Sequence, residues 1–456
     1  MKITFIIASV GKQINNHYVR SWIMEPLSLA TLSALTPPHI ERVFYDDRIE
    51  DIPFDEPTDL VAINTETYTA ARAYQIAYEY QKRNVKVILG GFHATLMPEE
   101  AAEYADSVLV GEAEGIWEDV LNDVMEGQIR KFYRQQSPQR SFSVTPDRSI
   151  FNGKGYPKLS LVETGRGCCF GCEFCSITHF FSRKYMNRSI KAIVDEIKSL
   201  KNKLVFFVDD NIGVHSRHSK ELFKALIPLK IKWVSQISMD VAHDEEFLKL
   251  MKESGCQGVL IGFESFNADT LKRMGKDVNK TYETYDYVVQ QFHKHGLALY
   301  ATFVMGYHDT EKDFEEIYRF GIRNKILYVA FNHLVPFPGT KLYERFEKEG
   351  RLRYQKWWLE PNYRFGDVVY EPDNISAQEL TELCLKYRYK YFNWMSILRR
   401  LPHKMYLLNP MLFFSYLLLN LTAKHQAKAR RNLIIGGNMQ EHSIKEVNTK
   451  LQLVEV

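Results

Sequence analysis

Residues 163–175 read ETGRGCCFGCEFC and contain four of the six cysteines in a chain of 456 residues. Cys168, Cys172 and Cys175 give the spacing C-x3-C-x2-C directly after the apolar run LSLVE. Three thiolates on so short a loop can converge on one soft metal centre. Cys169 is adjacent to Cys168, so we expect its side chain to point elsewhere. The stretch therefore predicts a strand that ends in a metal-binding loop.

Several kinds of site can use these thiols. A structural zinc site usually takes four protein ligands, and His179, four residues after Cys175, would complete a Cys3His set. A nucleophilic cysteine needs a neighbouring base and has no use for three thiols. An iron-sulfur cluster with three cysteine ligands leaves one iron of a 4Fe-4S cube free to bind a substrate. A disulfide framework is not expected, because six cysteines in a large chain without a secretory signal indicate a reducing compartment.

Apolar runs alternate with helical stretches after the cysteine loop. The runs are KLVFFVDDN, IKWVSQIS, GVLIGFES, LALYATFVMG and LYVAFNHLVPF. Together with LSLVETG they make six strand-helix units, which predicts a partial TIM-type (β/α)6 barrel of parallel strands. Chemistry in this architecture belongs at the carboxyl ends of the strands.

The first part of the chain shows the same alternation, in KITFIIASV, ERVFYD, DLVAINTET, VKVILGG and DSVLVGE. This predicts an open, parallel, Rossmann-like sheet wrapped by helices, and hence an α/β fold. Ligands of such sheets bind at the carboxyl ends of the strands, although ordinary turn chemistry also places small and polar residues there. The residues at these ends are Asn64, Thr65, Gly90, Gly91, Gly111 and Glu112.

We expect the chain to divide into three folded parts and a linker. Residues 1–125 form the Rossmann-like domain and residues 158–345 the barrel. Residues 126–157 are polar and basic without periodicity, which is typical of a linker. Residues 346–456 are aromatic and mostly helical. Chain length alone favours two or three domains.

Composition narrows the class of protein. The apolar content of 45% and charged content of 25% are typical of a folded globular protein. A formal net charge of +3 is small for this length and gives no argument for binding nucleic acid. The apolar run near residue 1 is too short to span a bilayer, and no cleavage site follows it. We expect a cytoplasmic protein.

The cysteine loop and the segments after it resemble the radical S-adenosylmethionine superfamily. The resemblance rests on the spacing and place of the cysteines, on the aromatic Phe174 before the third one, and on accessory segments in order along the barrel. It implies a 4Fe-4S cluster held by Cys168, Cys172 and Cys175, whose open iron binds S-adenosylmethionine. An electron from the cluster would cleave the sulfonium to give a 5'-deoxyadenosyl radical. A donor such as flavodoxin or ferredoxin would supply that electron.

The same resemblance implies a binding surface for S-adenosylmethionine at the strand ends. Phe174 would lie near the adenine, and the acidic segment after the second strand would hold the methionine ammonium. The third and fourth strands would line the ribose and methionine, and the fifth would end in a glycine turn. The residues assigned in this way are Asp209, Asp210, Asn211, Ser235, Gln236, Gly262, Glu264 and Gly306.

The N-terminal domain resembles the cobalamin-binding domain of cobalamin-dependent radical enzymes, a group that includes hopanoid methylases, bacteriochlorophyll methylases and the anaerobic cyclase of chlorophyll biosynthesis. The segments that carry the resemblance are DLVAINTET, GGFHATLMPEEA and ADSVLVGEAEGIW. It implies that a corrin lies between the domains, over the strand ends given above. The chain has no D-x-H-x-x-G motif for a lower cobalt ligand, and we expect His93 to be a turn residue. A domain that keeps the fold without the cofactor is the alternative.

The region after residue 345 carries many large apolar side chains. Trp357, Trp358, Tyr363, Phe365 and Trp394 suggest a large hydrophobic substrate, although packing against the barrel explains them equally well. The apolar run at 411–421 is about half a membrane span, so we do not expect a transmembrane helix. Basic residues flank this run, and 399–431 either lies in a membrane interface or packs on the barrel.

These features predict a radical S-adenosylmethionine enzyme that methylates an unactivated carbon of a lipid, isoprenoid or tetrapyrrole with the help of cobalamin. A radical oxidoreductase, a cyclase or an enzyme that forms carbon-carbon bonds without methyl transfer is the first alternative. A zinc-stabilised binding protein that keeps the barrel only as a scaffold is the non-enzymatic alternative.

Overall fold

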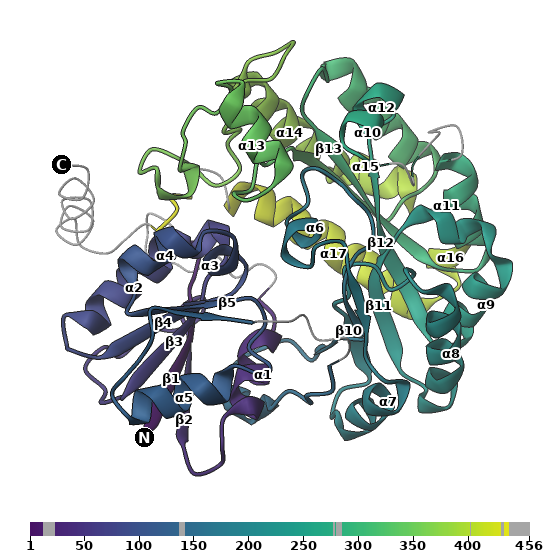
Figure 1. Ribbon diagram of the computed structural model, residues 1–456. Helices are drawn as coiled ribbons and strands as arrows, with labels where there is room; N and C mark the ends of the chain where they lie inside the picture. The colour runs from purple at the N-terminus through teal and green to yellow at the C-terminus, as the bar shows by residue number, and fades with distance from the viewer. Residues whose placement is uncertain are drawn as a thin grey trace.

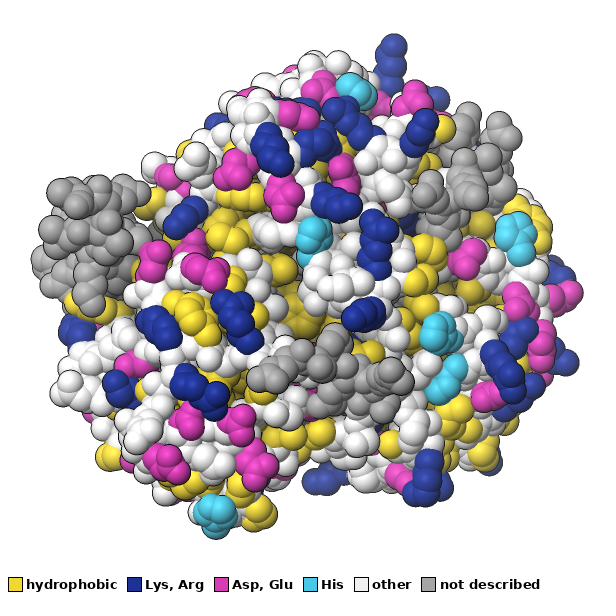
Figure 2. All heavy atoms as spheres, in the orientation of Figure 1, with side chains coloured by type: hydrophobic (Ala, Val, Ile, Leu, Met, Phe, Trp, Pro, Cys, Tyr) yellow, Lys and Arg dark blue, Asp and Glu magenta, His cyan; other side chains and the backbone are white. Residues whose placement is uncertain are grey.

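Two parallel sheets form the framework of the molecule. The computed structural model describes residues 1–11, 23–135, 142–276, 279, 285–401, 403–429 and 433–436. The N-terminal sheet and its helices lie beside the larger barrel, and the last helices pass behind the barrel strands in Figure 1. Figure 2 shows acidic and basic side chains interspersed over the same face, with apolar atoms between the two halves. The predicted fold class is confirmed.

The N-terminal sheet has six parallel strands in the order β2-β1-β3-β4-β5-β6. They are β1 (Lys2–Ile7), β2 (Glu41–Asp46), β3 (Leu60–Asn64), β4 (Lys86–Gly90), β5 (Ser107–Val110) and β6 (Phe132–Arg134). Their helices are α1 (Leu27–Leu35), η1 (Thr67–Thr69), α2 (Ala70–Gln81), α3 (Phe92–Leu96), α4 (Pro98–Tyr104) and α5 (Trp117–Met125). Successive side chains of β3 alternate between a core that includes α2 and a core that includes α1 and α5. Both faces are therefore covered, as parallel sheets require.

The barrel sheet also has six parallel strands, in the order β14-β13-β12-β11-β10-β7. They are β7 (Ser160–Val162), β10 (Leu204–Phe207), β11 (Lys232–Ile237), β12 (Cys256–Glu264), β13 (Ala298–Met305) and β14 (Tyr328–His333). The helices around them are α7 (Ile190–Ser199), α8 (Ser216–Leu226), η3 (Ile227–Leu229), η4 (Met239–His243), α9 (Glu245–Glu253), α10 (Ala268–Arg273), α11 (Tyr285–Lys294), α12 (Glu311–Arg323) and α13 (Lys341–Lys348). Each predicted apolar run of the barrel overlaps one of these strands, although β12 begins two residues before its run.

A small antiparallel pair supports the cysteine loop. It consists of β8 (Gly165–Gly167) and β9 (Tyr185–Asn187), and α6 (Ser176–Phe180) lies between them in the chain. The sequence pattern did not predict this pair, because strands of three residues are too short to show a period of two.

The segment predicted to be a linker contains ordered structure. β6 adds a sixth strand to the N-terminal sheet, and η2 (Arg148–Phe151) places the buried Phe151 in the core that includes α1 and α5. The prediction of a plain linker at 126–157 was therefore wrong for these residues; residues 136–141 lie outside the described ranges. Tyr133 is almost fully buried, so one aromatic side chain is enough to anchor the short strand. The division of the chain at residues 125, 157 and 345 stays a prediction.

The C-terminal region consists of η7 (Trp357–Leu359), α14 (Ala377–Tyr391), α15 (Trp394–Arg400), α16 (Lys404–Leu407) and α17 (Pro410–Ala429). Trp357, Trp358 and Tyr363 are buried in the core of the N-terminal domain, so they pack the two halves of the chain together. Trp394 is half exposed. None of the helices in the described ranges combines the length and the apolar character that a membrane span requires.

Candidate functional site

The three spaced cysteines lie together on the loop between β8 and α6. Cys172 is buried and Cys168 and Cys175 are half-buried, whereas Cys169 is exposed. The thiols of Cys168 and Cys172 interact electrostatically with each other and with that of Cys175, which places the three close to one another. This donor set fits a cluster with three thiolate ligands. The assignment of the individual ligands stays a prediction.

The zinc alternative requires a fourth ligand beside the three cysteines. A tetrahedral zinc ion with Zn–S distances of about 2.3 Å brings its sulfur ligands within roughly 3.8 Å of one another. In the described part of the chain, no group of three or more His, Cys, Asp or Glu side chains is placed to hold a single metal ion. His179, the fourth ligand of the zinc alternative, accepts a hydrogen bond at Nε2 from the backbone N–H of Lys341 at 3.1 Å. Cysteines that bind different irons of a cube lie farther apart than ligands of one ion.

A buried ammonium group lies beside the cysteines. Lys276 Nζ donates to Glu264 Oε1 at 2.9 Å, and the Lys276 side chain is 16% exposed. Burial raises the pKa of the Cys172 thiol to about 11, and the Lys276 ammonium acts in the opposite direction. Lys276 therefore offsets part of the negative charge that thiolates and a cluster would bring to this pocket.

The cysteine loop is anchored through Glu173. Its backbone N–H donates to Met274 O at 3.0 Å, and its own carbonyl accepts from Leu342 N–H at 3.1 Å. The Glu173 carboxylate accepts from Arg345 Nη2 at 2.7 Å and from the hydroxyl of Tyr307. Three separate parts of the barrel thus hold the loop between its second and third cysteines.

Of the two predicted ammonium-binding carboxylates, Asp209 is already engaged. Its two oxygens accept from Thr164 Oγ1 at 2.6 Å and from Thr164 N–H at 3.1 Å. Asp210 accepts from Gly167 N–H at 3.0 Å, directly before Cys168. Burial raises the pKa of Asp209 to about 7 and that of Asp210 to about 6. A cation bound beside Asp210 would keep that carboxylate ionised.

The predicted residues after β10 and on β11 make local hydrogen bonds. Asn211 is buried; its Oδ1 accepts from Gly213 and Ser238 N–H, and its Nδ2 donates to Ser238 Oγ. Ser235 Oγ donates to Phe207 O at 2.8 Å, and Gln236 Nε2 donates to Asp209 O at 3.4 Å. These side chains tie β10 to β11 and so fix the position of Asp209 and Asp210.

The two predicted glycines of the barrel lie where a side chain has no room. A Cβ at Gly262 would meet Glu264 Oε1 at 2.1 Å, and one at Gly306 would meet Leu334 Cδ1 at 2.4 Å. Glu264 itself has a φ of 66°, at a register shift in β12. Gly262 thus leaves the space that the Glu264 side chain occupies beside Lys276.

A cavity of about 720 Å³, here called the barrel cavity, lies against β13 and β14. Phe174 of the cysteine loop lines it, together with aromatic side chains that include Tyr300, Tyr328 and Phe365. The facing surface comes from α14 and from the last turns of α17. The volume lies within the range of known small-molecule pockets, roughly 300–1,000 Å³.

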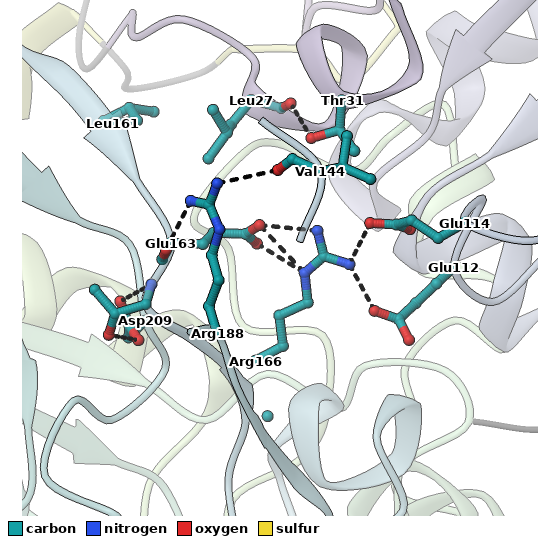
Figure 3. A network of polar contacts seen from close by, with 12 residues as sticks. Leu27, Thr31, Glu112, Glu114, Val144, Leu161, Glu163, Arg166, Arg188 and Asp209 are labelled. Atoms are coloured by element: carbon teal, nitrogen blue, oxygen red, sulfur yellow. Dashed lines mark hydrogen bonds and ion pairs between the residues drawn. The ribbon is translucent and has the colours of Figure 1, made fainter. Parts of the chain in front are cut away.

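Arg166 links the two domains two residues before Cys168. Figure 3 shows its guanidinium between Glu112 and Glu114 on one side and Glu163 on the other. The Arg166 Nη1 to carboxylate distances are 2.7 Å to both Glu112 and Glu114, and Nη2 lies 2.9 Å from Glu163. All four side chains are mostly buried. We call this set the interdomain network.

Next to the interdomain network, the carboxyl ends of the N-terminal strands line a second cavity of about 240 Å³, the sheet-end cavity. Gly91 has a φ of 98°, and a Cβ there would meet Asn64 Oδ1 at 2.4 Å. Asn64 Oδ1 and Thr65 Oγ1 are buried without a hydrogen-bond partner in the described structure. Gly90, Gly111 and Glu112 also line the cavity. Five of the six residues predicted at these strand ends therefore line the sheet-end cavity. The sixth, Thr65, is not among the lining residues.

His93 lies away from this cavity as a buried structural residue. Its Nε2 is 3.1 Å from both Tyr74 Oη and Glu100 Oε1, and its Nδ1 is 3.4 Å from Thr67 Oγ1. Trp358 Nε1 donates to the same Glu100 oxygen at 2.8 Å. Both ring nitrogens of His93 therefore lie within hydrogen-bond distance of neighbouring side chains, which gives His93 a structural role.

Three residues of the site were not predicted from the sequence: Arg166, Glu173 and Lys276. Arg166 and Glu173 lie inside residues 163–175. Their charge, in a stretch made mostly of glycine and cysteine, was the signal that could have identified them as candidates. Lys276 carries no such signal, because it meets Glu264 and the cysteine loop only through the fold.

Comparison with known proteins gives the following matches. Residues 162–321 match the family described as Radical SAM superfamily. The chain is 31% identical over 413 residues to a bacteriochlorophyllide d C-12(1)-methyltransferase of Chlorobaculum tepidum, covering 88% of this chain and 89% of that protein. It is 29% identical to a bacteriochlorophyllide d C-8(2)-methyltransferase of the same organism, covering 82% and 87%. The solved radical S-adenosylmethionine methyltransferase TsrM from Kitasatospora setae superposes with a TM-score of 0.63 at 16% identity, over 84% of this chain and 82% of TsrM.

Proposed function

Because the chain belongs to the radical S-adenosylmethionine superfamily, in the subgroup with an N-terminal cobalamin-binding-type domain, we propose that it methylates an unactivated carbon of a tetrapyrrole. The observation that carries the proposal is the 31% identity, over 88% of the chain, to a methyltransferase that acts on bacteriochlorophyllide d. A tetrapyrrole is a flat, hydrophobic small molecule. The aromatic side chains that line the barrel cavity suit such a substrate.

The residues present fit the two cofactors that the proposal requires. Cys168, Cys172 and Cys175 would hold the 4Fe-4S cluster. The sheet-end cavity would hold part of cobalamin, since 240 Å³ is too small for an entire corrinoid. Its unpartnered Asn64 oxygen offers a hydrogen-bond acceptor, and Gly91 and Gly111 let a ligand approach the backbone. When bound, the cluster supplies the electron that cleaves S-adenosylmethionine, and cobalamin carries the methyl group.

The charged side chains around the cysteine loop would orient S-adenosylmethionine. Its carboxylate would pair with the Lys276 ammonium, and its own ammonium with Asp210, whose pKa burial raises. Phe174 would contact the adenine. Glu173 keeps the loop in place through its anchors on Tyr307 and Arg345. The barrel and the N-terminal domain together exclude water from the reacting carbon.

Replacing Lys276 with Met is expected to weaken binding of S-adenosylmethionine by about ten- to a hundredfold, the range for loss of a charged hydrogen bond. Equilibrium dialysis of the anaerobic, cluster-loaded protein with S-adenosylmethionine measures the affinity. Lys272→Met, an exposed lysine on the neighbouring α10, is the matched control and should bind as the unmodified protein does. Equal affinities of the two variants would contradict the role of Lys276.

We also propose that a reduced flavodoxin or ferredoxin supplies the electron and that the protein works in the cytoplasm. The barrel cavity is the proposed place of the tetrapyrrole, because Phe174 of the cysteine loop forms part of its lining. A tetrapyrrole bound in this cavity would lie close to the S-adenosylmethionine that is cleaved at the cluster.

Methyl transfer is tested directly with isotope label. The anaerobic protein, loaded with cluster and cobalamin, is incubated with a chemical reductant, trideuteromethyl-labelled S-adenosylmethionine and bacteriochlorophyllide d. The expected product contains one or more additional trideuteromethyl groups by mass spectrometry, and only when cobalamin is present. Formation of an additional ring without the label would instead identify a cyclase. An unchanged tetrapyrrole in a protein that still cleaves S-adenosylmethionine would overturn the proposed substrate class.

A further inference from the structure

The helices α15, α16 and α17 carry a large exposed apolar surface. Leu408 is 80% exposed, Phe414 67% and Leu418 66%. These side chains belong to a set that we call the C-terminal apolar patch: Trp394, Met395, Leu398, Leu407, Leu408, Met411, Phe414, Leu418 and Leu421. Large contiguous apolar surfaces on soluble proteins mark sites of contact with a partner or a membrane.

The patch lies opposite the side of the helices that packs on the barrel. Ile397, Tyr406 and Tyr416 point inward and form a core with Ala298 and Leu327, at the start of β13 and just before β14. On α17, the exposed side chains recur at 411, 414, 418 and 421, on the other side of the helix from Tyr416. A helix that is apolar all round is normally buried on all sides. The outward side of α17 therefore lacks a partner in the described structure.

The charged residues of the helices that carry the patch have one sign. Between residues 383 and 440 the sequence contains no Asp or Glu. Arg399 and Lys404 are exposed at the patch, and Lys424 Nζ lies 5.1 Å from the centre of the Trp394 ring. The further basic residues Lys428, Arg430 and Arg431 lie outside the described side chains. A tryptophan flanked by lysine and arginine is typical of protein segments at a lipid-water interface.

We propose that the C-terminal apolar patch docks on the surface of a membrane that contains anionic lipid. Apolar side chains would enter the interface while Arg399, Lys404 and Lys424 contact the headgroups. A second copy of the chain is the weaker occupant, because a two-fold contact would bring the same basic patch of both copies together, and its own helices offer no acidic side chain to pair with the cations. Lysine is also depleted in interfaces between proteins.

Docking through this patch has a consequence for the substrate. Ala423 and Gln426, near the end of α17, line the barrel cavity. The same helix that contacts lipid through Phe414 and Leu418 thus forms a wall of that cavity two turns later. If the substrate is hydrophobic, as the proposed function requires, docking would hold one wall of its cavity close to the membrane in which such a substrate dissolves.

Flotation with lipid vesicles tests the proposal on the full-length, cluster-loaded protein. It should float with vesicles of phosphatidylglycerol and phosphatidylcholine, and far less with phosphatidylcholine alone. Phe414→Ser with Leu418→Ser should lower binding roughly a hundredfold, because two large apolar side chains no longer enter the lipid. Arg399→Gln with Lys404→Gln should lower binding to the anionic vesicles roughly fivefold for each cation removed.

Met125→Ser provides the matched control, since Met125 is 54% exposed on α5, outside the patch, and its replacement should change nothing. Each variant is first shown to keep the unfolding temperature and the visible spectrum of the unmodified protein, so a loss of binding cannot come from misfolding. Failure of the unmodified protein to float with either vesicle would overturn the proposal. A dimer that dissociates in the Phe414/Leu418 variant, without vesicle binding, would assign the patch to self-association instead.

Discussion

Replacing Cys168, Cys172 or Cys175 with Ala is expected to abolish the iron-sulfur cluster and every radical reaction that depends on it, whereas Cys169→Ala retains both. A cluster with three protein ligands has no spare thiolate on this loop, because the Cys169 side chain is exposed. Each single replacement therefore removes one ligand out of three. We expect cleavage of S-adenosylmethionine by each of these three variants to fall below the detection limit.

The measurement is iron and sulfide content after anaerobic reconstitution, together with the visible and electron paramagnetic resonance spectra. Cys256→Ala and Cys384→Ala are additional controls for iron and sulfide content, since both residues are buried in the barrel core and neither belongs to the cysteine loop. Retention of a full cluster in the Cys168 variant together with its loss in the Cys169 variant would show that the ligand register is wrong. A colourless protein with one zinc would revive the zinc alternative.

Arg166→Ala is expected to destabilise the folded protein by about 3–5 kcal/mol, the cost of leaving buried charges without their partner. The carboxylates of Glu112, Glu114 and Glu163 would then face one another around the vacated guanidinium position. Burial already raises the pKa of Glu112 with Arg166 in place. Urea unfolding of the cofactor-free protein measures the loss.

The pH dependence of this loss identifies its cause. Burial raises the pKa of Glu112 and Arg166 opposes that rise, so in the variant the folded-state pKa of Glu112 would rise further and protonation would favour the folded state. The deficit should be largest near neutral pH and shrink as the pH falls toward about 5. Arg217→Ala removes an exposed arginine from an ion pair with Glu221 and should cost well under 1 kcal/mol. A deficit that does not change with pH would point to lost packing rather than unpaired charge.

The fold could be predicted from the sequence because its signals are local. Eleven of the strands in the two parallel sheets fall on apolar runs bounded by turn residues, including β7, which is followed by the cysteine loop. β6 was missed because only Phe132 and Tyr133 distinguish it from a polar segment. The antiparallel pair of β8 and β9 was missed because strands of three residues are too short to show a period of two.

The site was only partly predictable because its residues meet through the fold. The spacing of the cysteines is visible in the sequence, but the contact between Arg166 and Glu112 joins residues 54 positions apart. Lys276 reaches Glu264 only through the turn after α10. The polar groups of Asn211 and Ser235 bond to neighbouring segments of the barrel, and their predicted contact with S-adenosylmethionine stays a prediction. The spacing of the three cysteines can be recognised in the sequence. The residues that hold the cysteine loop in place are scattered along the chain and show no such spacing.

The interdomain network has a thermodynamic consequence. Arg166 joins the end of β5, beside the sheet-end cavity, to the strand that leads into Cys168. A ligand that orders Glu112 in the N-terminal domain therefore also orders the cysteine loop. Linkage makes this effect reciprocal: by whatever factor a bound corrinoid strengthens the equilibrium binding of the cluster, a loaded cluster strengthens corrinoid binding by the same factor. The two cofactors are expected to bind cooperatively, with Arg166 as one point of coupling and the contact between Phe92 of α3 and Phe180 of α6 as another.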